Sequence, residues 1–416
     1  MDQGTFETYE SEVRSYCRTF PTVFTHAKGS ILHDQDGRRF IDFFNGAGAL
    51  NYGHNPDYIK QRLIDYLQSD NIIHALDMYT VAKGEFIEAL ETRILTPKGY
   101  TYKLQFPGPT GTNAVEAALK LARKVTKRTN VFALMGCFHG MTLGALSLTS
   151  DTGSRAGAGL PLGDVTHIPA PYQFGDAFAL EYLRTILDDD HSGIDKPAAI
   201  VVETVQAEGG VYVISNEFLQ GVERIAHEHG ILLIVDDIQV GCSRTGSFLS
   251  FERAGIHPDI VCMSKSIGGY GFPFSLTMMK PELDIWSPGE HNGTFRGNQL
   301  AMVAATAGVE ITVNEDVEAG ARRRGEIVKD FLTREVATLD DRIEVRGLGM
   351  IWGIDVHEDD LSAKISRVCF DHGVILERAG RKNGVVKLMP SLVIPDEILF
   401  EGLGVIRNAV AEVLGR

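Results

Sequence analysis

The chain has 416 residues, of which 44% are hydrophobic and 23% are charged; these ordinary proportions exclude disordered and fibrous proteins. Its 55 acidic and 40 basic residues give a formal net charge of −15, which repels nucleic acid and anionic lipid surfaces. No apolar run approaches the roughly 18 residues of a membrane helix, and the start of the chain lacks the regions of a signal peptide. We therefore expect neither a nucleic-acid partner nor a membrane partner.

The cysteines exclude further classes of protein. They are far apart along the chain, their number is odd, and no two have the C-x-x-C spacing of zinc sites. We therefore expect no disulfide framework and no metal site, and we predict small buried core residues in a cytoplasmic protein. The five are Cys17, Cys137, Cys242, Cys262 and Cys369.

The N-terminal segment begins with about 20 mixed residues that predict an arm or a short helix. Next, Asp36 and Gly37 stand between two extended patterns at residues 30–34 and 38–44, which predicts a hairpin. Apolar residues at helical spacing then predict two helices, over 59–70 and 82–95.

From about residue 100, short apolar runs alternate with amphipathic stretches. Strands are predicted at 131–135, 199–203, 231–235, 260–263 and 274–279, and helices at 113–127, 217–229 and 299–313. This alternation predicts an α/β fold whose mostly parallel central sheet is flanked by helices. Such sheets bind ligands at the carboxyl ends of their strands.

The C-terminal part has an α+β pattern of its own. Helices are predicted at 321–339 and 396–414, and strands at 349–355 and 385–389. We predict three parts of the chain: an N-terminal arm with part of a small domain at 1–58, a large domain at 59–317, and a C-terminal small domain at 318–416.

Two features that follow one another along the chain suit a phosphorylated ring. Small residues around Gly111 and Thr112 open the helix 113–127, where free backbone N–H groups and the helix dipole attract phosphate. A plain helix cap formed by Thr112 or Asn113 is the alternative. Phe138, after the strand 131–135, can stack on a planar ring or pack in the core, and His139 can stack or donate a hydrogen bond.

Polar side chains also follow the next two strands. Glu203 and Glu208 flank an amide after the strand residues 199–202, and a solvated loop is the alternative interpretation. Asp236 ends the apolar strand 231–235, where burial of its charge is costly unless it has a partner. A cationic pyridinium nitrogen would be such a partner; a helix cap and a metal ligand are the other interpretations.

Lys265 follows the strand 260–263, between serines and near two glycines. Lysine is almost never fully buried without a reason, and a lysine that loses its proton can form a Schiff base. A phosphate cradle, a ring-stacking aromatic, an acid for a ring nitrogen and this lysine together are what a pyridoxal phosphate enzyme requires.

The sequence also resembles the class III (omega) aminotransferases, fold type I enzymes that use pyridoxal 5′-phosphate. Within that class it is most similar to the diaminobutyrate–2-oxoglutarate transaminases of the ectoine pathway. The similar stretches are ESEVRSY at 10–16, GAGALNYGHN at 46–55, GPTGTNAVEAALKLARKV at 108–125, FHGMTLGAL at 138–146, IVDDIQ at 234–239 and HNGTFRGNQ at 291–299.

The resemblance implies a role for each matching residue. Lys265 and Asp236 are the implied catalytic pair: Lys265 forms the Schiff base, and Asp236 contacts the ring nitrogen. The implied cofactor contacts are Gly111, Thr112, Phe138, His139, Glu203, Asp236, Ile238, Gln239, Lys265 and Thr294. Thr294 matches a threonine that reaches the phosphate of the neighbouring subunit, which implies at least a homodimer with shared active sites.

The implied substrate contacts include departures from the class. Lys387 stands where many relatives carry an arginine that grips a substrate carboxylate, and lysine cannot bind a carboxylate bidentately. The partner of Glu208 is therefore open, and Arg378 or Arg381 is an alternative carboxylate contact. Ala207 stands where glycine is common.

The implied reaction is a ping-pong transamination of L-glutamate and L-aspartate 4-semialdehyde to 2-oxoglutarate and L-2,4-diaminobutyrate, in either direction. One alternative is the same chemistry on ornithine, 4-aminobutyrate or a secondary-metabolite intermediate. Another is a retired homologue that binds the cofactor and acts as a regulator or scaffold. A Rossmann nucleotide binder is excluded, because no strand is followed by G-x-G-x-x-G.

Overall fold

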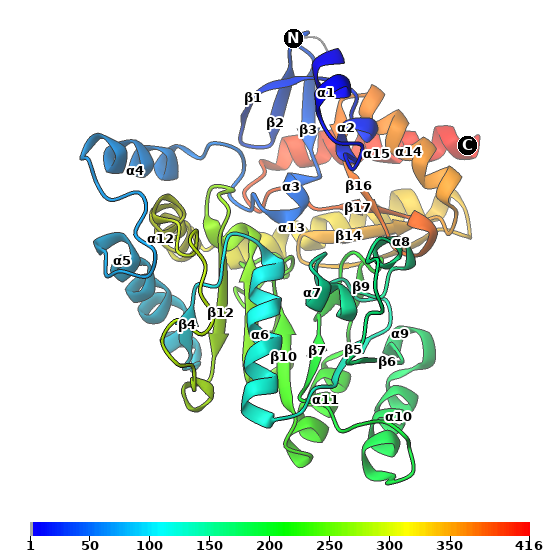
Figure 1. Cartoon of the computed structure of the whole chain (residues 1–416). Helices are drawn as coiled ribbons and strands as arrows, with labels where there is room; N and C mark the ends of the chain where they lie inside the picture. The colour runs from blue at the N-terminus through cyan, green and yellow to red at the C-terminus, as the bar shows by residue number, and fades with distance from the viewer. Residues whose placement is uncertain (1–2) are drawn as a thin grey trace.

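A computed structural model describes residues 3–416. Figure 1 shows a large domain built on a central sheet, with a smaller lobe above it that contains both ends of the chain. The strands of the described residues form four sheets, of seven, four, four and two strands. The largest of them positions most of the predicted site residues.

The seven-stranded sheet has the order β4-β12-β11-β10-β7-β5-β6. Its strands are β4 (Lys103–Gln105), β12 (Ser275–Met279), β11 (Ile260–Ser264), β10 (Leu232–Asp236), β7 (Ala199–Val202), β5 (Val131–Leu134) and β6 (Val165–Ile168). Only β12 runs antiparallel to its neighbours, so the predicted mostly parallel sheet is confirmed. The sequence analysis missed β4 and β6 because these short edge strands contain polar residues and lack an apolar run.

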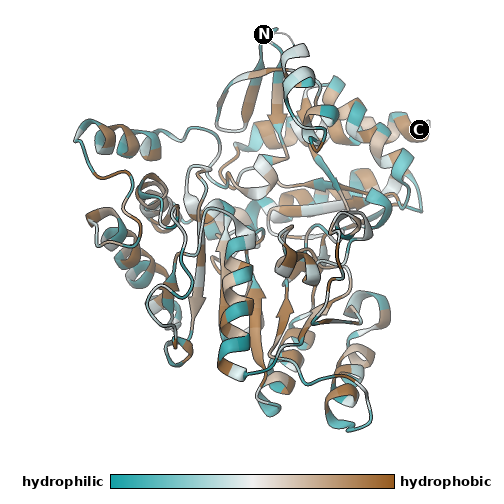
Figure 2. Ribbon diagram, in the orientation of Figure 1, coloured by the Kyte–Doolittle hydropathy of each residue, from teal (hydrophilic) through white to brown (hydrophobic). Residues whose placement is uncertain are grey.

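Both faces of this sheet are buried, which explains why its central strands are apolar at nearly every position. In β5, Val131 and Ala133 pack towards helix α6 (Gly111–Thr126), whereas Phe132 and Leu134 join the core on the opposite face. Helix α11 (Asn216–Glu228) also contributes to that second core. Figure 2 shows the brown strands lying behind α6, whose outward side is teal.

The smaller lobe joins segments from both ends of the chain. Strands β1 (Phe24–Lys28), β2 (Ile31–Asp34) and β3 (Arg39–Asp42) contain the predicted hairpin, and β3 pairs in parallel with β15 (Val374–Ile375). The second four-stranded sheet has the order β13-β14-β17-β16. Its strands are β13 (Glu344–Leu348), β14 (Ile351–Asp355), β17 (Val385–Leu388) and β16 (Glu377–Ala379).

The remaining elements surround these sheets. They are α1 (Gly4–Tyr9), α2 (Tyr16–Thr19), α3 (Asn45–Gly48), α4 (Asp57–Gln68), α5 (Val81–Leu90), α7 (Leu143–Leu148), α8 (Thr152–Ala156), α9 (Pro171–Phe174), α10 (Asp176–Asp188), β8 (Val205–Gln206), β9 (Tyr212–Val213), α12 (Gln299–Asn314), α13 (Val317–Phe331), α14 (Asp359–Asp371) and α15 (Asp396–Leu414). The helices predicted over 82–95 and 321–339 begin as α5 and α13, and both continue as π-helical turns.

The expectation for the cysteines is confirmed for four of the five. Cys137, Cys242, Cys262 and Cys369 are buried, whereas Cys17 is exposed on the short helix α2, so the prediction was wrong for this residue. All five thiols are free. None of the helices within residues 3–416 has the length and apolar character needed to cross a membrane.

Candidate active site

The carboxyl ends of β5, β7, β10 and β11 surround a cavity of about 200 Å³. Nine of the predicted site residues line it, so one cavity brings together side chains from widely separated parts of the sequence. They are Gly111, Thr112, Phe138, His139, Glu203, Asp236, Ile238, Gln239 and Lys265. Glu208, one of the predicted substrate contacts, lines it as well.

The start of α6 forms one wall of the cavity. Thr110 precedes the helix in an extended conformation, and the side chain of Asn113 accepts a hydrogen bond from the Thr110 amide over 3.1 Å. Neither Thr112 nor Asn113 is therefore the N-terminal cap residue that the sequence analysis considered. The helix starts at Gly111, which leaves the first-turn N–H groups near the cavity, where they suit an anion.

Two glycines allow the chain to approach closely here. A Cβ atom on Gly111 would lie 3.0 Å from Ile238 Cδ1. Gly140 has a φ of +135°, and a Cβ atom there would lie 2.6 Å from Thr112 Oγ1. Side chains at these positions would therefore press into the lining of the cavity.

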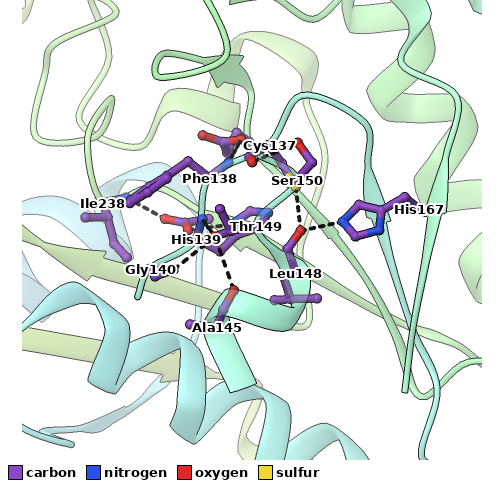
Figure 3. A network of polar contacts seen from close by, with 12 residues as sticks. Cys137, Phe138, His139, Gly140, Ala145, Leu148, Thr149, Ser150, His167 and Ile238 are labelled. Carbon is purple, nitrogen blue, oxygen red and sulfur yellow. Dashed lines mark hydrogen bonds and ion pairs between the residues drawn. The ribbon is translucent and has the colours of Figure 1, made fainter. Parts of the chain in front are cut away.

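The loop after β5 is held by a network of polar contacts. Figure 3 shows the His139 amide donating to Thr149 Oγ1, over 3.0 Å, and the thiol of Cys137 donating to the Leu148 carbonyl. The Phe138 amide donates to Glu203 over 3.3 Å. Phe138 is half-buried and lines the cavity, so its ring is available for stacking rather than enclosed in the core.

Asp236 is buried at the end of β10 and forms a short contact with His139. Its Oδ2 lies 2.7 Å from His139 Nδ1, and its Oδ1 accepts the Ile238 amide over 3.1 Å. The other ring nitrogen of His139 is buried and has no hydrogen-bond partner among residues 3–416. His139 therefore makes a hydrogen bond of the kind that its position allowed, and it also lines the cavity.

The pKa values of two acids near Asp236 are raised, which favours the neutral forms of these acids. Burial, with the nearby charge of Asp236, holds the pKa of Glu203 well above its ordinary range. Burial also raises the pKa of Asp237 to about 7. Asp236 therefore lies beside two acids whose pKa values are raised by burial, and of these two only Glu203 lines the cavity.

Lys265 begins a turn at the end of β11, with a left-handed φ of +54° that is uncommon for a residue with a side chain. Its Nζ donates to the Ala47 carbonyl over 2.9 Å. Burial lowers the pKa of its amine, and the nearby Glu208 carboxylate opposes that shift only in part. A neutral amine is the nucleophilic form of lysine.

Glu208, whose side chain is partly exposed, forms an ion pair with the buried Lys387, with 2.5 Å between Oε1 and Nζ. Lys387 is fully buried and also lies 3.0 Å from Glu377, its neighbour across the β16–β17 register. Burial favours the neutral forms, but the mutual attraction prevails: it lowers the pKa of Glu208 and raises that of Lys387. The partner of Glu208, left open by the sequence, is thus Lys387.

Gln239 connects the part of the cavity near Lys265 with the part near Glu208. Its side-chain amide donates to the Ala47 carbonyl and to Glu208, over 3.0 Å in each case. The Ala47 carbonyl thus receives both Gln239 and Lys265. A backbone carbonyl has no signature in the sequence, so this contact could not be predicted.

Three predicted site residues do not line the cavity: Lys387, which reaches it through Glu208, and also Thr294 and Arg378. Thr294 is exposed in a turn and is not among the described residues that line the cavity. Arg378 pairs with Asp359 over 2.6 Å and faces a second hollow beside the cavity.

The cavity fits the cofactor that the sequence predicts. The open N–H groups at Gly111 suit a phosphate, Phe138 and Ile238 suit a ring, and Asp236 suits a ring nitrogen. A lysine whose burial favours the neutral amine stands in the same cavity and suits an aldehyde carbon. Each group on pyridoxal phosphate that needs a partner thus finds a residue of the right chemistry.

Comparison with known proteins decides the family. The family model described as aminotransferase class-III matches residues 13–410. This chain belongs to the class-III aminotransferase family. The aminotransferase is 51% identical to a diaminobutyrate–2-oxoglutarate transaminase of Nocardia farcinica over 414 residues, 99% of this chain and 95% of that one. A protein of the same name from Streptomyces coelicolor is 49% identical over 417 residues, 99% of this chain and 98% of that one.

Solved structures confirm the fold of the aminotransferase. An ornithine aminotransferase from Toxoplasma gondii superposes with a TM-score of 0.87 at 26% identity, covering 99% of this chain and 94% of that one. An aminotransferase from Bacillus anthracis superposes with a TM-score of 0.88 at 23% identity, covering 98% and 97%, a likeness that concerns the fold alone. The prediction of a fold type I transferase is therefore confirmed.

The sequence analysis missed two residues that lie near Lys387 in the aminotransferase. Glu377 is the second carboxylate on Lys387, and Tyr16 donates a hydrogen bond of 2.7 Å to Glu377. Glu377 could have been found only from the pairing of β16 with β17, and Tyr16 only from the packing of the N-terminal arm. Neither relation leaves a periodic or spaced signal in the sequence.

Proposed function

We propose that this aminotransferase transfers an amino group from L-glutamate to L-aspartate 4-semialdehyde, giving 2-oxoglutarate and L-2,4-diaminobutyrate, and that it also catalyses the reverse reaction. The substrates are supported by relatives that share about half of the residues over nearly the whole length of both chains. The observation that carries the chemistry is a single cavity that holds both Asp236 and a lysine whose pKa is lowered by burial.

Pyridoxal 5′-phosphate is the cofactor, and when bound it supplies an electron sink for the bonds at the reacting carbon. Asp236 would keep the ring nitrogen protonated, and His139 positions the carboxylate of Asp236. Gly111 and Thr112 would hold the phosphate, Phe138 and Ile238 would pack on the ring, and Glu203 and Gln239 would contact its polar edge.

Lys265 has two tasks in this proposal. Its amine would hold the cofactor covalently and would give way to a substrate amine. Its free Nζ would then carry the proton to and from the substrate carbon that bears the amino group. The lowered pKa serves both tasks, because both require a neutral amine.

Glu208 and Lys387 accommodate the difference between the two substrates. Glutamate carries a carboxylate on its reacting carbon, whereas diaminobutyrate carries only hydrogen there. While the pair is closed, Lys387 is neutralised, which suits the reacting carbon of diaminobutyrate. When Glu208 moves aside, Lys387 has a charge to offer the α-carboxylate of glutamate.

We also infer that the enzyme is a homodimer in the cytoplasm. Thr294 and Phe295 are exposed in a turn, and in a dimer this turn of one subunit would complete the phosphate site of the other. The five free thiols are compatible with a reducing compartment. The small-molecule amino donor and the acceptor are its other partners.

The test is a titration of the purified enzyme with amines, followed by the visible absorbance of its bound cofactor. L-Glutamate and L-2,4-diaminobutyrate are each expected to remove the band, whereas ornithine and 4-aminobutyrate leave it. A response to ornithine alone would keep the chemistry and overturn the substrate. A band that no amine changes would support a retired homologue instead.

A further inference from the structure

Beside the cofactor cavity lies a larger hollow of about 890 Å³, and the two share Phe138 and Glu208. The loop that closes this hollow is tied to the cavity, because the Gly380 amide donates to the Glu208 carbonyl over 2.9 Å. A substrate whose reacting end lies near Lys265 can therefore extend past Glu208 into this space.

Arg381 differs from the two other arginines around the hollow, because its guanidinium group is not already bound to a carboxylate or to carbonyls of residues 3–416. Arg155 donates to three carbonyls at the C-terminal end of α7, and Arg378 pairs with Asp359. Arg381 forms no ion pair with any carboxylate among residues 3–416, and its one side-chain hydrogen bond goes to Tyr172 Oη, over 3.1 Å. Most of its guanidinium donors are therefore available to a ligand.

A stack of aromatic rings holds this guanidinium in place. Arg381 lies 5.5 Å from the ring centre of Tyr172, which stacks on Tyr212 with 3.7 Å between centroids and 4° between planes. Arg346 caps the far side of Tyr212 at 4.0 Å and is itself fixed by Asp355 over 2.7 Å. A planar guanidinium that is positioned in advance suits a planar carboxylate.

Lys387 is poorly suited to the same task. Two carboxylates, the partly exposed Glu208 and the buried Glu377, pair with it from two directions. If Glu208 moves aside, the charge released on Lys387 is the one proposed for the α-carboxylate of glutamate. A carboxylate at the far end of the substrate therefore needs another partner, and the hollow offers Arg381.

We propose that Arg381 binds the distal carboxylate of both substrates, a role that rests on the proposed function. In L-2,4-diaminobutyrate the carboxylate carbon lies three bonds from the reacting carbon C4. In L-glutamate the side-chain carboxylate carbon lies three bonds from the reacting carbon C2. One fixed cation therefore serves both half-reactions, and Tyr172 acts as the residue that positions it.

The test compares L-2,4-diaminobutyrate with 1,3-diaminopropane, which is the same molecule without its carboxylate. Rates of loss of the visible cofactor band give an efficiency for each amine. The wild type is expected to prefer diaminobutyrate, and Arg381→Gln is expected to reduce that preference by about 10- to 100-fold, the value of a charge-assisted carboxylate contact. Arg381→Lys is expected to restore part of it, because the charge returns without the planar fork.

Lys382→Gln is the matched control, because it removes the same charge one residue further along the chain. Its expected change in preference is less than about 3-fold, since Lys382 lies at the same hollow but is exposed and forms no ion pair with residues 3–416. An equal loss in Lys382→Gln would overturn the proposal, because general positive charge would then explain the preference. An unchanged preference in Arg381→Gln would overturn it as well.

A binding measurement separates this proposal from the proposed function. Glutarate, an unreactive dicarboxylate, is titrated into wild type and variants by calorimetry, with no turnover involved. Arg381→Gln is expected to weaken glutarate binding by at least about 10-fold, and Tyr172→Ala by less than that. If the wild type reacts with neither diamine, the substrate assignment fails, and the glutarate titration still decides whether Arg381 binds carboxylates; equal affinities in wild type and Arg381→Gln would contradict it.

Discussion

The two ends of the active-site cavity are built in different ways. At the cofactor end, Asp236 and Lys265 stand at the ends of neighbouring strands of one sheet, and short stretches of sequence place them there. At the substrate end, Glu208, Lys387 and Glu377 come from a loop of the large domain and from two strands of the smaller lobe. The residues proposed for the chemistry thus lie on one sheet, and those proposed for substrate recognition lie where two parts of the protein meet.

The largest expected effect concerns the cofactor end. Lys265→Ala removes the nucleophile and the proton carrier together, so turnover is expected to fall by at least about 10⁴-fold. The measurement is steady-state turnover, together with the visible absorbance of the purified enzyme. Lys329→Ala, at an exposed position on α13, is the control and is expected to retain wild-type values. Equal turnover in wild type and Lys265→Ala would contradict the assignment.

A second prediction sharpens the contrast between neighbouring acids. Asp236→Asn keeps the shape of the side chain but loses the charge, and turnover is expected to fall by about 10²- to 10³-fold. Asp237→Asn makes the same change one residue further along the chain, where burial already raises the pKa to about 7. We expect less than about 10-fold loss there, measured by the same assay. Equal losses in the two variants would remove the distinction between these acids.

At the substrate end, smaller and selective effects are expected. Glu208→Gln leaves Lys387 with Glu377 alone, so the efficiency with diaminobutyrate is expected to fall about 10-fold relative to that with glutamate. If Glu208→Gln changed both efficiencies by the same factor, the two-substrate role of this pair would be wrong.

Glu377→Gln keeps the Glu208 contact and is expected to lower the free energy of unfolding by about 2 kcal/mol, measured by urea denaturation.

The smallest expected effect is on the pH dependence of stability. Burial raises the pKa of Glu203, so above its unfolded pKa of about 4.3 the folded protein binds more protons than the unfolded chain. Its contribution to stability therefore decreases as the pH rises towards the folded pKa, by up to about 1.4 kcal/mol per pH unit. Glu203→Gln is expected to lack this decrease.

The measurement for Glu203 is the free energy of unfolding of both proteins across the pH range, with the cofactor state kept the same. The difference between the two curves isolates the contribution of this one carboxyl group. A wild type whose stability rose with pH relative to Glu203→Gln would contradict the raised pKa.

The sequence predicted which residues would gather around Asp236 and Lys265 because the signals for them are local. Each of the residues Phe138, Asp236 and Lys265 follows a recognisable apolar run, and parallel strands bring their carboxyl ends to one edge of a sheet. The edge strands β4 and β6 lacked such runs and were missed. The exposure of Cys17 was missed because it depends on how the short helix α2 lies on the rest of the protein.

The substrate end could be predicted only in part. Lys387 was found through its alignment with an arginine of related enzymes, but its partners depend on strand register and on the approach of a distant loop. The stack of Tyr172 and Tyr212 brings together a short helix and a two-residue strand, and neither element has a periodic pattern. Contacts of this kind are set by tertiary packing, which spacing along one sequence does not encode.

The measurement that tests the central claim most directly is product analysis of one reaction. The purified enzyme is incubated with L-glutamate and L-aspartate 4-semialdehyde, and both products are quantified by mass spectrometry. We predict that 2-oxoglutarate and L-2,4-diaminobutyrate form in equal amounts and that Lys265→Ala forms neither. Consumption of glutamate without formation of diaminobutyrate would contradict the proposed function.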